Sequence, residues 1–201
     1  MVKRLFDIAA SLMGILAFGL PMLLIAAAIR LESRGPAIFR QRRAGRRGRP
    51  FVMLKFRTMR ADTDPYAPSP RSRRDARLTR LGRLLRETSL DELPQLFNVL
   101  LGQMSLVGPR PLYERQADLW DDRQRRRLDV RPGITGYAQA CGRGSLSIED
   151  KIELDLYYVE HRRFRLDLKI LWRTAANALA GRGEIYERRC SSRQECQTDS
   201  R

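Results

Sequence analysis

The chain has 201 residues, which is enough for one domain with a hydrophobic core and an appended segment. It carries 39 Lys and Arg residues against 23 Asp and Glu residues, and this net charge of +16 implies an anionic partner: nucleic acid, an anionic membrane surface or a phosphorylated substrate. Three scattered cysteines argue against a disulfide scaffold, and the single histidine, His161, leaves little material for histidine-based nucleophile activation or a multi-histidine metal site.

Residues 8–29 form an almost wholly apolar run in which Ser11 is the only polar side chain. As a straight helix this run would reach about 33 Å, enough to cross the hydrocarbon core of a bilayer. Its length and the arginine-rich segment that follows argue against a cleaved signal peptide. Because cations flank both ends, at Lys3 and over 30–49, the positive-inside rule draws both flanks toward the cytoplasm. Two alternatives remain open from the residues alone: a simple span, and a re-entrant helix that bends at Pro21.

The rest of the sequence predicts a compact domain that is largely helical. Segments 37–41 and 51–56 predict two strands joined by a basic turn that contains glycine and proline, which indicates a β-hairpin. Apolar periodicity and breakers predict helices over 78–87, 91–101, 112–128, 148–160 and 168–180, with loops over 61–75 and 133–144. The predicted fold class is therefore α+β and mostly helical, with a membrane anchor over 1–34, a domain over 35–180 and a polar tail over 181–201.

The segment SLDELPQL (89–96) places two carboxylates side by side, Asp91 and Glu92. One interpretation is structural: Ser89 and Glu92 have the spacing of a capping box at a helix start. Another is chemical, because a carboxylate can attack a phosphoryl centre and form an acyl phosphate. Adjacent helical residues diverge by about 100°, so one carboxylate would act as nucleophile and the other as a magnesium ligand.

Several cations lie beside turns or helix boundaries, where they suit phosphate binding rather than a solvated helix face. They are Lys55, Arg57, Arg86, Arg110, Arg131 and Arg143. Arg110 stands between two prolines in GPRP (108–111), which would fix its backbone and lower the entropic cost of using it. Together with Asp91 and Glu92, these residues predict a phosphate-handling site.

The chain resembles a known family, the bacterial sugar transferases, which are small monotopic phosphoglycosyl transferases. The matching segments are KRLFD (3–7), the apolar run with its central proline, GPAIFRQRRAGRRGRPFVMLKFRTM (35–59), LRETSLDELPQLFNVLLGQMSLVGPRP (85–111), RPGITGYAQACGR (131–143) and LDLYYVEHRRFRLDLKIL (154–171). They follow one another in the family's order and cover most of residues 3–180.

The resemblance implies an enzyme of the bacterial inner membrane that faces the cytoplasm. A re-entrant helix bent near Pro21 would anchor it, with amphipathic helices at the membrane interface. Family members transfer a sugar-1-phosphate from a nucleotide-diphosphate sugar, usually UDP-linked, to a polyprenol phosphate, usually undecaprenyl phosphate. This reaction initiates the assembly of exopolysaccharide, capsule, O-antigen or glycoprotein glycans.

The resemblance also implies residue roles. Asp91 would form the covalent phosphosugar intermediate and release UMP, and Glu92 would be the residue linked to Mg²⁺. The expected substrate-binding residues are Lys55, Arg57, Arg86, Arg110, Arg143 and Asp155. Two positions depart from the family pattern: Leu20 stands where some members have serine before the bend proline, and Gly144 stands where asparagine is frequent.

A different class of function would also explain the charge, namely a basic, membrane-tethered protein that binds nucleic acid. The sequence contains no recognised nucleic-acid module, and the basic stretch 40–49 has no interleaved aromatic residues. The sequence therefore favours the transferase, while the identity of the sugar stays open.

Overall fold

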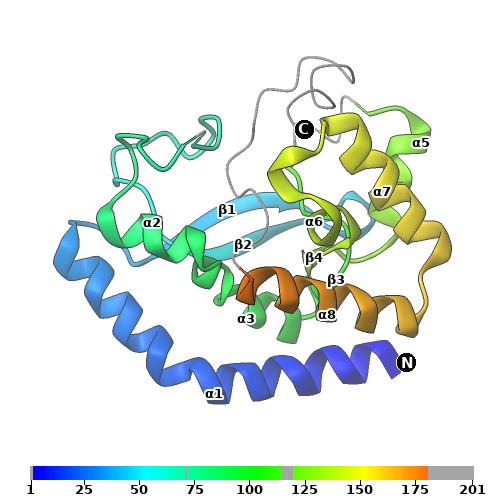
Figure 1. Ribbon diagram of the computed structural model, residues 1–201, viewed down its shortest axis with the longest axis horizontal. Helices are drawn as coiled ribbons and strands as arrows, with labels where there is room; N and C mark the ends of the chain where they lie inside the picture. Colours follow the sequence, from blue (N-terminus) through cyan, green and yellow to red (C-terminus); the bar gives the residue numbers. More distant parts are fainter. Residues whose placement is uncertain (1, 71, 115–119, 181–201) are drawn as a thin grey trace.

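The computed structural model describes residues 2–70, 72–114 and 120–180 (Figure 1). The first half contains α1 (Val2–Glu32), β1 (Ile38–Ala44), β2 (Pro50–Phe56), α2 (Arg80–Glu87) and α3 (Gln95–Leu100). The second half contains β3 (Ser105–Val107), α5 (Asp122–Arg125), β4 (Gly133–Thr135), α6 (Tyr137–Cys141), α7 (Ile148–His161) and α8 (Phe164–Leu179). Short 3-10 turns cover Arg46–Gly48, Leu90–Glu92, Arg126–Asp129 and Arg143–Ser145. The prediction of a mostly helical α+β fold with a small hairpin is confirmed.

The hairpin of β1 and β2 is antiparallel, and its register places Phe39 opposite Lys55 and Gln41 opposite Met53. Side chains alternate between the two faces of a strand, so one face carries the odd-numbered residues of both strands. Gln41 and Met53 on that face are buried, whereas Arg42 on the other face is exposed. β1 continues three residues beyond the predicted 41, because alternating arginines keep one side of the strand in solvent while the other packs inward.

The second sheet is a parallel pair, β3 and β4, in which Ser105 lies opposite Gly133. Its existence corrects the prediction of a loop over 133–144, which instead contains β4 and α6. Strands of three residues are too short to show a period. The glycines allow two backbone segments to approach closely. A Cβ on Gly133 would lie 2.1 Å from the backbone nitrogen of Gly108, so no side chain fits between these segments.

Three predicted helices differ from the structure. The helix predicted from 91 begins as an α-helix only at Gln95, and the two carboxylates lie in the preceding 3-10 turn. Of the helix predicted over 112–128, residues 115–119 lie outside the described part, and α5 with its following 3-10 turn forms the remainder. α8 begins at Phe164 rather than at 168. The predicted tail, 181–201, lies outside the described residues.

Helix α1 is bent into two arms that open toward the rest of the protein (Figure 1). Pro21 lies inside it, and a proline removes the hydrogen bond to the carbonyl four residues earlier, which accounts for the bend. Much of its apolar surface is uncovered: Leu16, for example, is 76% exposed. By length and composition α1 could cross a membrane.

Polar contacts hold the first arm of α1 against the domain. The Lys3 ammonium lies 2.7 Å from the Asp167 carboxylate at the start of α8. The buried Asp7 carboxylate accepts hydrogen bonds from the Ser105 hydroxyl and from the backbone N–H of Leu106 in β3. The segment KRLFD therefore fastens the first turns of α1 to the rest of the domain.

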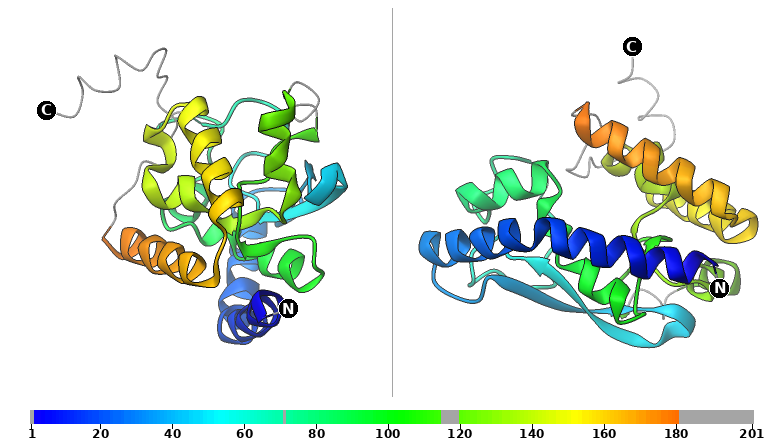
Figure 2. Two further views of the ribbon diagram at one scale, coloured as in Figure 1. Left: turned by 90° about the vertical axis from the view of Figure 1, so that its right-hand side faces the viewer. Right: turned by 90° about the horizontal axis from the view of Figure 1, so that it is seen from below.

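The second arm is held to the same domain. The buried Arg57 guanidinium donates to the backbone carbonyls of Ile29 and Ser33 at the end of α1. The Glu32 carboxylate accepts a hydrogen bond of 3.1 Å from the backbone N–H of Leu81 in α2. Figure 2 shows α1 running along one side of the molecule from end to end, and both of its ends make polar contacts with the same domain.

Candidate active site

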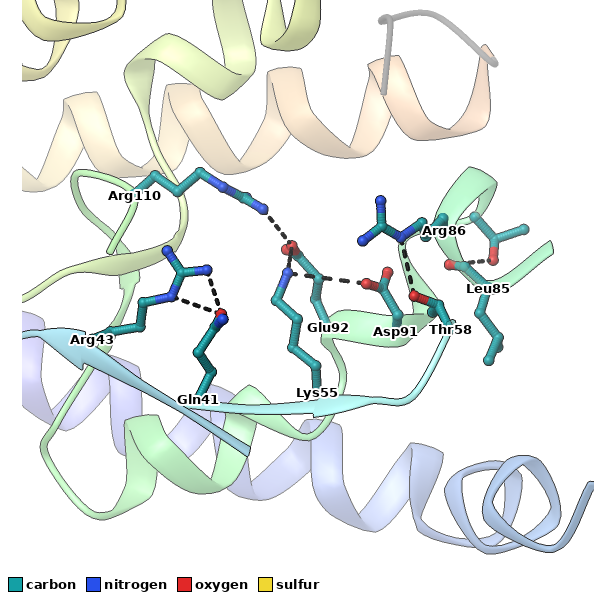
Figure 3. A network of polar contacts seen from close by, with 10 residues as sticks. Gln41, Arg43, Lys55, Thr58, Leu85, Arg86, Asp91, Glu92 and Arg110 are labelled. Atoms are coloured by element: carbon teal, nitrogen blue, oxygen red, sulfur yellow. Dashed lines mark hydrogen bonds and ion pairs between the residues drawn. The ribbon is translucent and has the colours of Figure 1, made fainter. Parts of the chain in front are cut away.

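The two carboxylates meet a lysine from the hairpin (Figure 3). Lys55 projects from β2, and its ammonium lies 2.7 Å from a Glu92 carboxylate oxygen and 4.0 Å from an Asp91 carboxylate oxygen. The Arg110 guanidinium approaches the same Glu92 oxygen from the opposite side at 3.3 Å. A strand, a 3-10 turn and the GPRP segment thus bring four charged side chains to one place.

The local backbone explains why the carboxylates face the hairpin. Ser89 adopts the left-handed conformation, with φ 58° and ψ 15°, which reverses the chain between α2 and the 3-10 turn. This conformation costs a residue other than glycine roughly 1–2 kcal/mol, so the fold holds it in place by its surroundings. The Ser89 side chain does not cap the turn, and the predicted capping box is therefore wrong. Pro94 then directly precedes α3.

Burial sets the electrostatics of Asp91, which is only 7% exposed. Removal from water raises the pKa of its carboxyl; Lys55 opposes this effect, and the neighbouring Glu92 charge adds to it. A partly desolvated carboxylate is a better nucleophile toward an electrophilic phosphorus once cations have neutralised the phosphate.

Two further arginines flank the carboxylates. On one side, the Arg86 side chain donates to the Thr58 hydroxyl at 3.0 Å, just beyond β2. On the other side, Arg43 of β1 donates to Gln41 and lies against the Tyr113 ring, 3.7 Å from its centroid. Burial lowers the pKa of Arg43 to about 10, so it still carries its charge at neutral pH.

A pocket opens between the hairpin, the GPRP segment and the 3-10 turn Leu90–Glu92, which carries both carboxylates and is called the dyad turn below. Its lining consists of Arg43, Met53, Lys55, Glu92, Gln95, Arg110, Pro111 and Gly133. Asp91 is not part of this lining, but its carboxylate lies 4.0 Å from the ammonium of Lys55, which is, and 9% of the Asp91 side chain is still exposed. Arg43 and Gln95 were not predicted as site residues. The strand period was the available signal for Arg43, since the hairpin register puts it on the same face as Lys55.

The structure brings Asp91, Glu92, Lys55, Arg86 and Arg110 together, as one site would require. Other predicted site residues lie elsewhere. The guanidinium of Arg57 is occupied by the end of α1, and Asp155 is buried in α7 in an ion pair with Arg127. Arg131 donates to the Gly102 carbonyl. The side chain of Arg143 lies outside the described part, although its backbone begins a 3-10 turn.

The two carboxylates are also candidate ligands for Mg²⁺. Within the described ranges no group of three or more His, Cys, Asp and Glu side chains could hold a metal ion. Magnesium usually needs only one or two carboxylates when substrate phosphates complete its shell, and Glu92 with Asp91 fits that donor set. Lys55 already contacts Glu92, so a divalent cation would compete with its ammonium.

The fold and the site define a pocket lined by Arg43, Lys55, Arg110 and Glu92, on a domain joined to a helix long and apolar enough for a membrane. Residues 1–181 match the model of the family described as bacterial sugar transferase. The chain belongs to this family and is an enzyme of the phosphoglycosyl transferase class.

Named relatives agree with this assignment. The chain is 45% identical over 182 residues to the uncharacterized sugar transferase EpsL of Bacillus subtilis, covering 90% of this chain and 89% of that protein. It is 44% identical over 185 residues to the UDP-glucose:undecaprenyl-phosphate glucose-1-phosphate transferase of Caulobacter vibrioides, covering 88% and 69%. It is 39% identical over 188 residues to a UDP-N-acetylgalactosamine-undecaprenyl-phosphate N-acetylgalactosaminephosphotransferase of Aeromonas hydrophila, covering 90% and 44%.

Proposed function

We propose that this protein transfers a sugar-1-phosphate from a UDP-sugar to undecaprenyl phosphate, in two displacements that share one covalent intermediate. A carboxylate oxygen of Asp91 attacks the phosphorus attached to the sugar, and the bond from that phosphorus to the bridging oxygen breaks. UMP leaves with the electron pair. An oxygen of the lipid phosphate then attacks the same phosphorus and releases the Asp91 carboxylate.

The observation that carries this proposal is the buried Asp91 carboxylate beside Lys55, which itself lines a pocket together with Arg43 and Arg110. Phosphoryl transfer depends mainly on positioning and on neutralising the charge of the phosphate. Lys55 and Arg110 supply that neutralisation from two sides of Glu92. The names of the relatives support the donor and acceptor classes, and they include more than one sugar.

We propose Mg²⁺ as a bound cofactor that helps to neutralise the phosphate charge. Glu92, together with substrate phosphates, would hold it, and the ion would supply further neutralisation of the pyrophosphate charge. The residues of this chain would do the rest: Asp91 forms the bond to phosphorus, and Arg110 and Lys55 hold the phosphate oxygens.

The anchor supports an interface location. Both ends of α1 are held to one domain, at Asp167 and at Arg57, so they lie on the same side of any membrane that α1 enters. This favours the re-entrant helix over the simple span. α8 also exposes large apolar side chains beside α1, including Trp172 at 77%. The basic flanks of α1 favour the cytoplasmic face of the inner membrane, where a soluble donor meets a lipid acceptor.

The test is to detect the intermediate. The purified protein is mixed with a UDP-sugar and Mg²⁺ without lipid acceptor, quenched in acid and analysed by peptide mass spectrometry. We expect one sugar-phosphate adduct on the peptide that contains Asp91, one equivalent of UMP, and neither in Asp91→Asn. Asp122→Asn, which removes an exposed carboxylate, is the matched control and should behave as the wild type. Full transfer by Asp91→Asn would refute the nucleophile.

A further inference from the structure

Gln95 is a buried amide that lines the pocket without a partner. It is 2% exposed, and its side-chain nitrogen contacts no acceptor among the described residues. It follows Glu92 by three residues and Asp91 by four, so the start of α3 places it beneath the dyad turn. Neither the predicted phosphate contacts nor the ion pairs around Glu92 make use of it.

Two neighbouring buried amides are satisfied, whereas the buried side-chain nitrogen and oxygen of Gln139 in α6, away from this pocket, also have no partner among the described residues. Asn98, one turn further along α3, donates to the Val52 carbonyl and to Gln103 and accepts from the backbone N–H of Leu54. Gln41 donates to the Pro65 carbonyl. A buried N–H that makes no hydrogen bond is costly, and such groups call for an explanation at each position. At Gln95 the position itself offers one, because the pocket it lines is the candidate active site.

The chemistry of the pocket selects the missing partner. The unpaired atom is a donor, so its partner is an acceptor, and the surrounding Lys55, Arg43 and Arg110 attract an anion. A phosphoryl oxygen meets both conditions. Resting on the proposed function, we propose that Gln95 donates a hydrogen bond to a non-bridging oxygen of the phosphoryl group that is transferred.

This contact serves both displacements, because the same phosphoryl group stays at Asp91 while the nucleotide leaves and the lipid arrives. A neutral donor holds the oxygen in place without adding positive charge to the pocket. Additional positive charge would bind the anionic product more tightly and slow its release. Removing one preorganised donor of this kind typically costs 10²–10³ in kcat. The loss therefore appears mainly in kcat rather than in KM, and equally for every sugar.

The test compares Gln95→Met and Gln95→Leu with the wild type. Single-turnover UMP release is measured with a UDP-glucose and UDP-N-acetylgalactosamine pair, and thermal unfolding is followed in the same detergent. We expect about 100-fold slower UMP release from both donors. We also expect a Tm equal to or above that of the wild type, because the unpaired buried amide is gone.

Gln103→Met is the matched control. Gln103 accepts from buried Asn98, so its loss should lower the Tm while UMP release stays within about threefold of the wild type.

Three results would overturn the inference: a Gln95→Met rate within threefold of the wild type, a Tm that falls with the rate, or a loss confined to one sugar, which would place the contact on the sugar. A wild-type protein that releases no UMP from either donor would instead refute the proposed function, and this inference with it.

Discussion

Lys55 is the residue that connects the two carboxylates, because its ammonium lies between Glu92 and Asp91. Burial raises the pKa of the Asp91 carboxyl, and among the cations that oppose this rise Lys55 has the largest effect. The charge of one strand residue therefore controls how reactive the neighbouring turn is.

Replacing Lys55 by Met should slow UMP release by about 100-fold, because the phosphate loses a cation and Asp91 is less ionised at neutral pH. The measurement is single-turnover release at saturating donor. Arg49→Met removes one exposed charge at the hairpin and should change the rate less than twofold. Equal rates for the two variants would show that only the overall charge matters.

Asp155, for which the family resemblance implies substrate binding, lies in an environment that predicts an effect on stability. It is buried in α7 against Arg127, and burial raises its pKa to about 6, although Arg127 opposes the shift. The unfolded chain releases this proton near pH 3.8. The protonated native state thus contributes stability that is fully present below about pH 4 and is lost as the pH rises through 6.

We expect the wild type to lose on the order of 3 kcal/mol of stability between pH 4 and 7 relative to Asp155→Asn, which cannot titrate. Thermal unfolding across this pH range, in one detergent, measures the difference. Parallel stability curves for the two proteins would contradict the assignment. Substrate binding by Asp155 would instead leave stability unchanged and raise KM.

At the scale of elements, the close pairing of β3 with β4 positions the Arg110 side of the pocket. Gly108 precedes Arg110 by two residues, and its backbone lies directly against Gly133. The glycine-rich stretch was expected to be loop-like, yet here it is one of the most tightly packed parts of the fold.

Gly133→Ala should destabilise the protein by about 3 kcal/mol and abolish activity, because the new methyl group would lie 2.1 Å from the Gly108 nitrogen. Thermal unfolding and UMP release are the measurements. Gly19→Ala is the control: a Cβ there has nothing within 4 Å, and alanine favours a helix. A Gly133→Ala protein with a normal Tm would show that the backbone around Gly108 and Gly133 can shift to accommodate the methyl group.

At the scale of the whole molecule, α1 is both the anchor and part of the catalytic body. Its first arm is bound to β3 and α8, and its second arm to α2 and β2. In the re-entrant arrangement proposed above, the long apolar surface between these ends would enter the membrane while both ends stay on one side of it.

A labelling experiment tests this arrangement. In a protein whose cysteines are replaced by serine, single cysteines at Val2 and Arg34 flank α1. Both should react with a membrane-impermeant maleimide in inside-out vesicles, and neither in right-side-out vesicles, with detergent-solubilised protein as the control. Reaction of one position in each kind of vesicle would establish a simple span.

The sequence alone was sufficient for the long apolar helix, the hairpin and α7, and it drew attention to the adjacent carboxylates Asp91 and Glu92. These features are encoded locally, by a long apolar run, by strand and helix periods and by an unusual pair of carboxylates. The helix predicted over 148–160 is present as α7, and its apolar residues Ile152 and Leu156 are both buried. The family resemblance added the reaction class, which composition and period do not contain.

Tertiary structure decided the rest, because the relevant contacts join residues far apart in the chain. Lys55 and Glu92 are 37 residues apart, and Lys3 and Asp167 are 164 apart. The sequence identifies Arg57 and Lys55 as equally suitable cations, but the structure gives them different partners. Arg57 donates to carbonyls at the end of α1, whereas Lys55 contacts the two carboxylates. Only packing assigns such residues, because it fixes which charges share a pocket and which are used to hold the fold together.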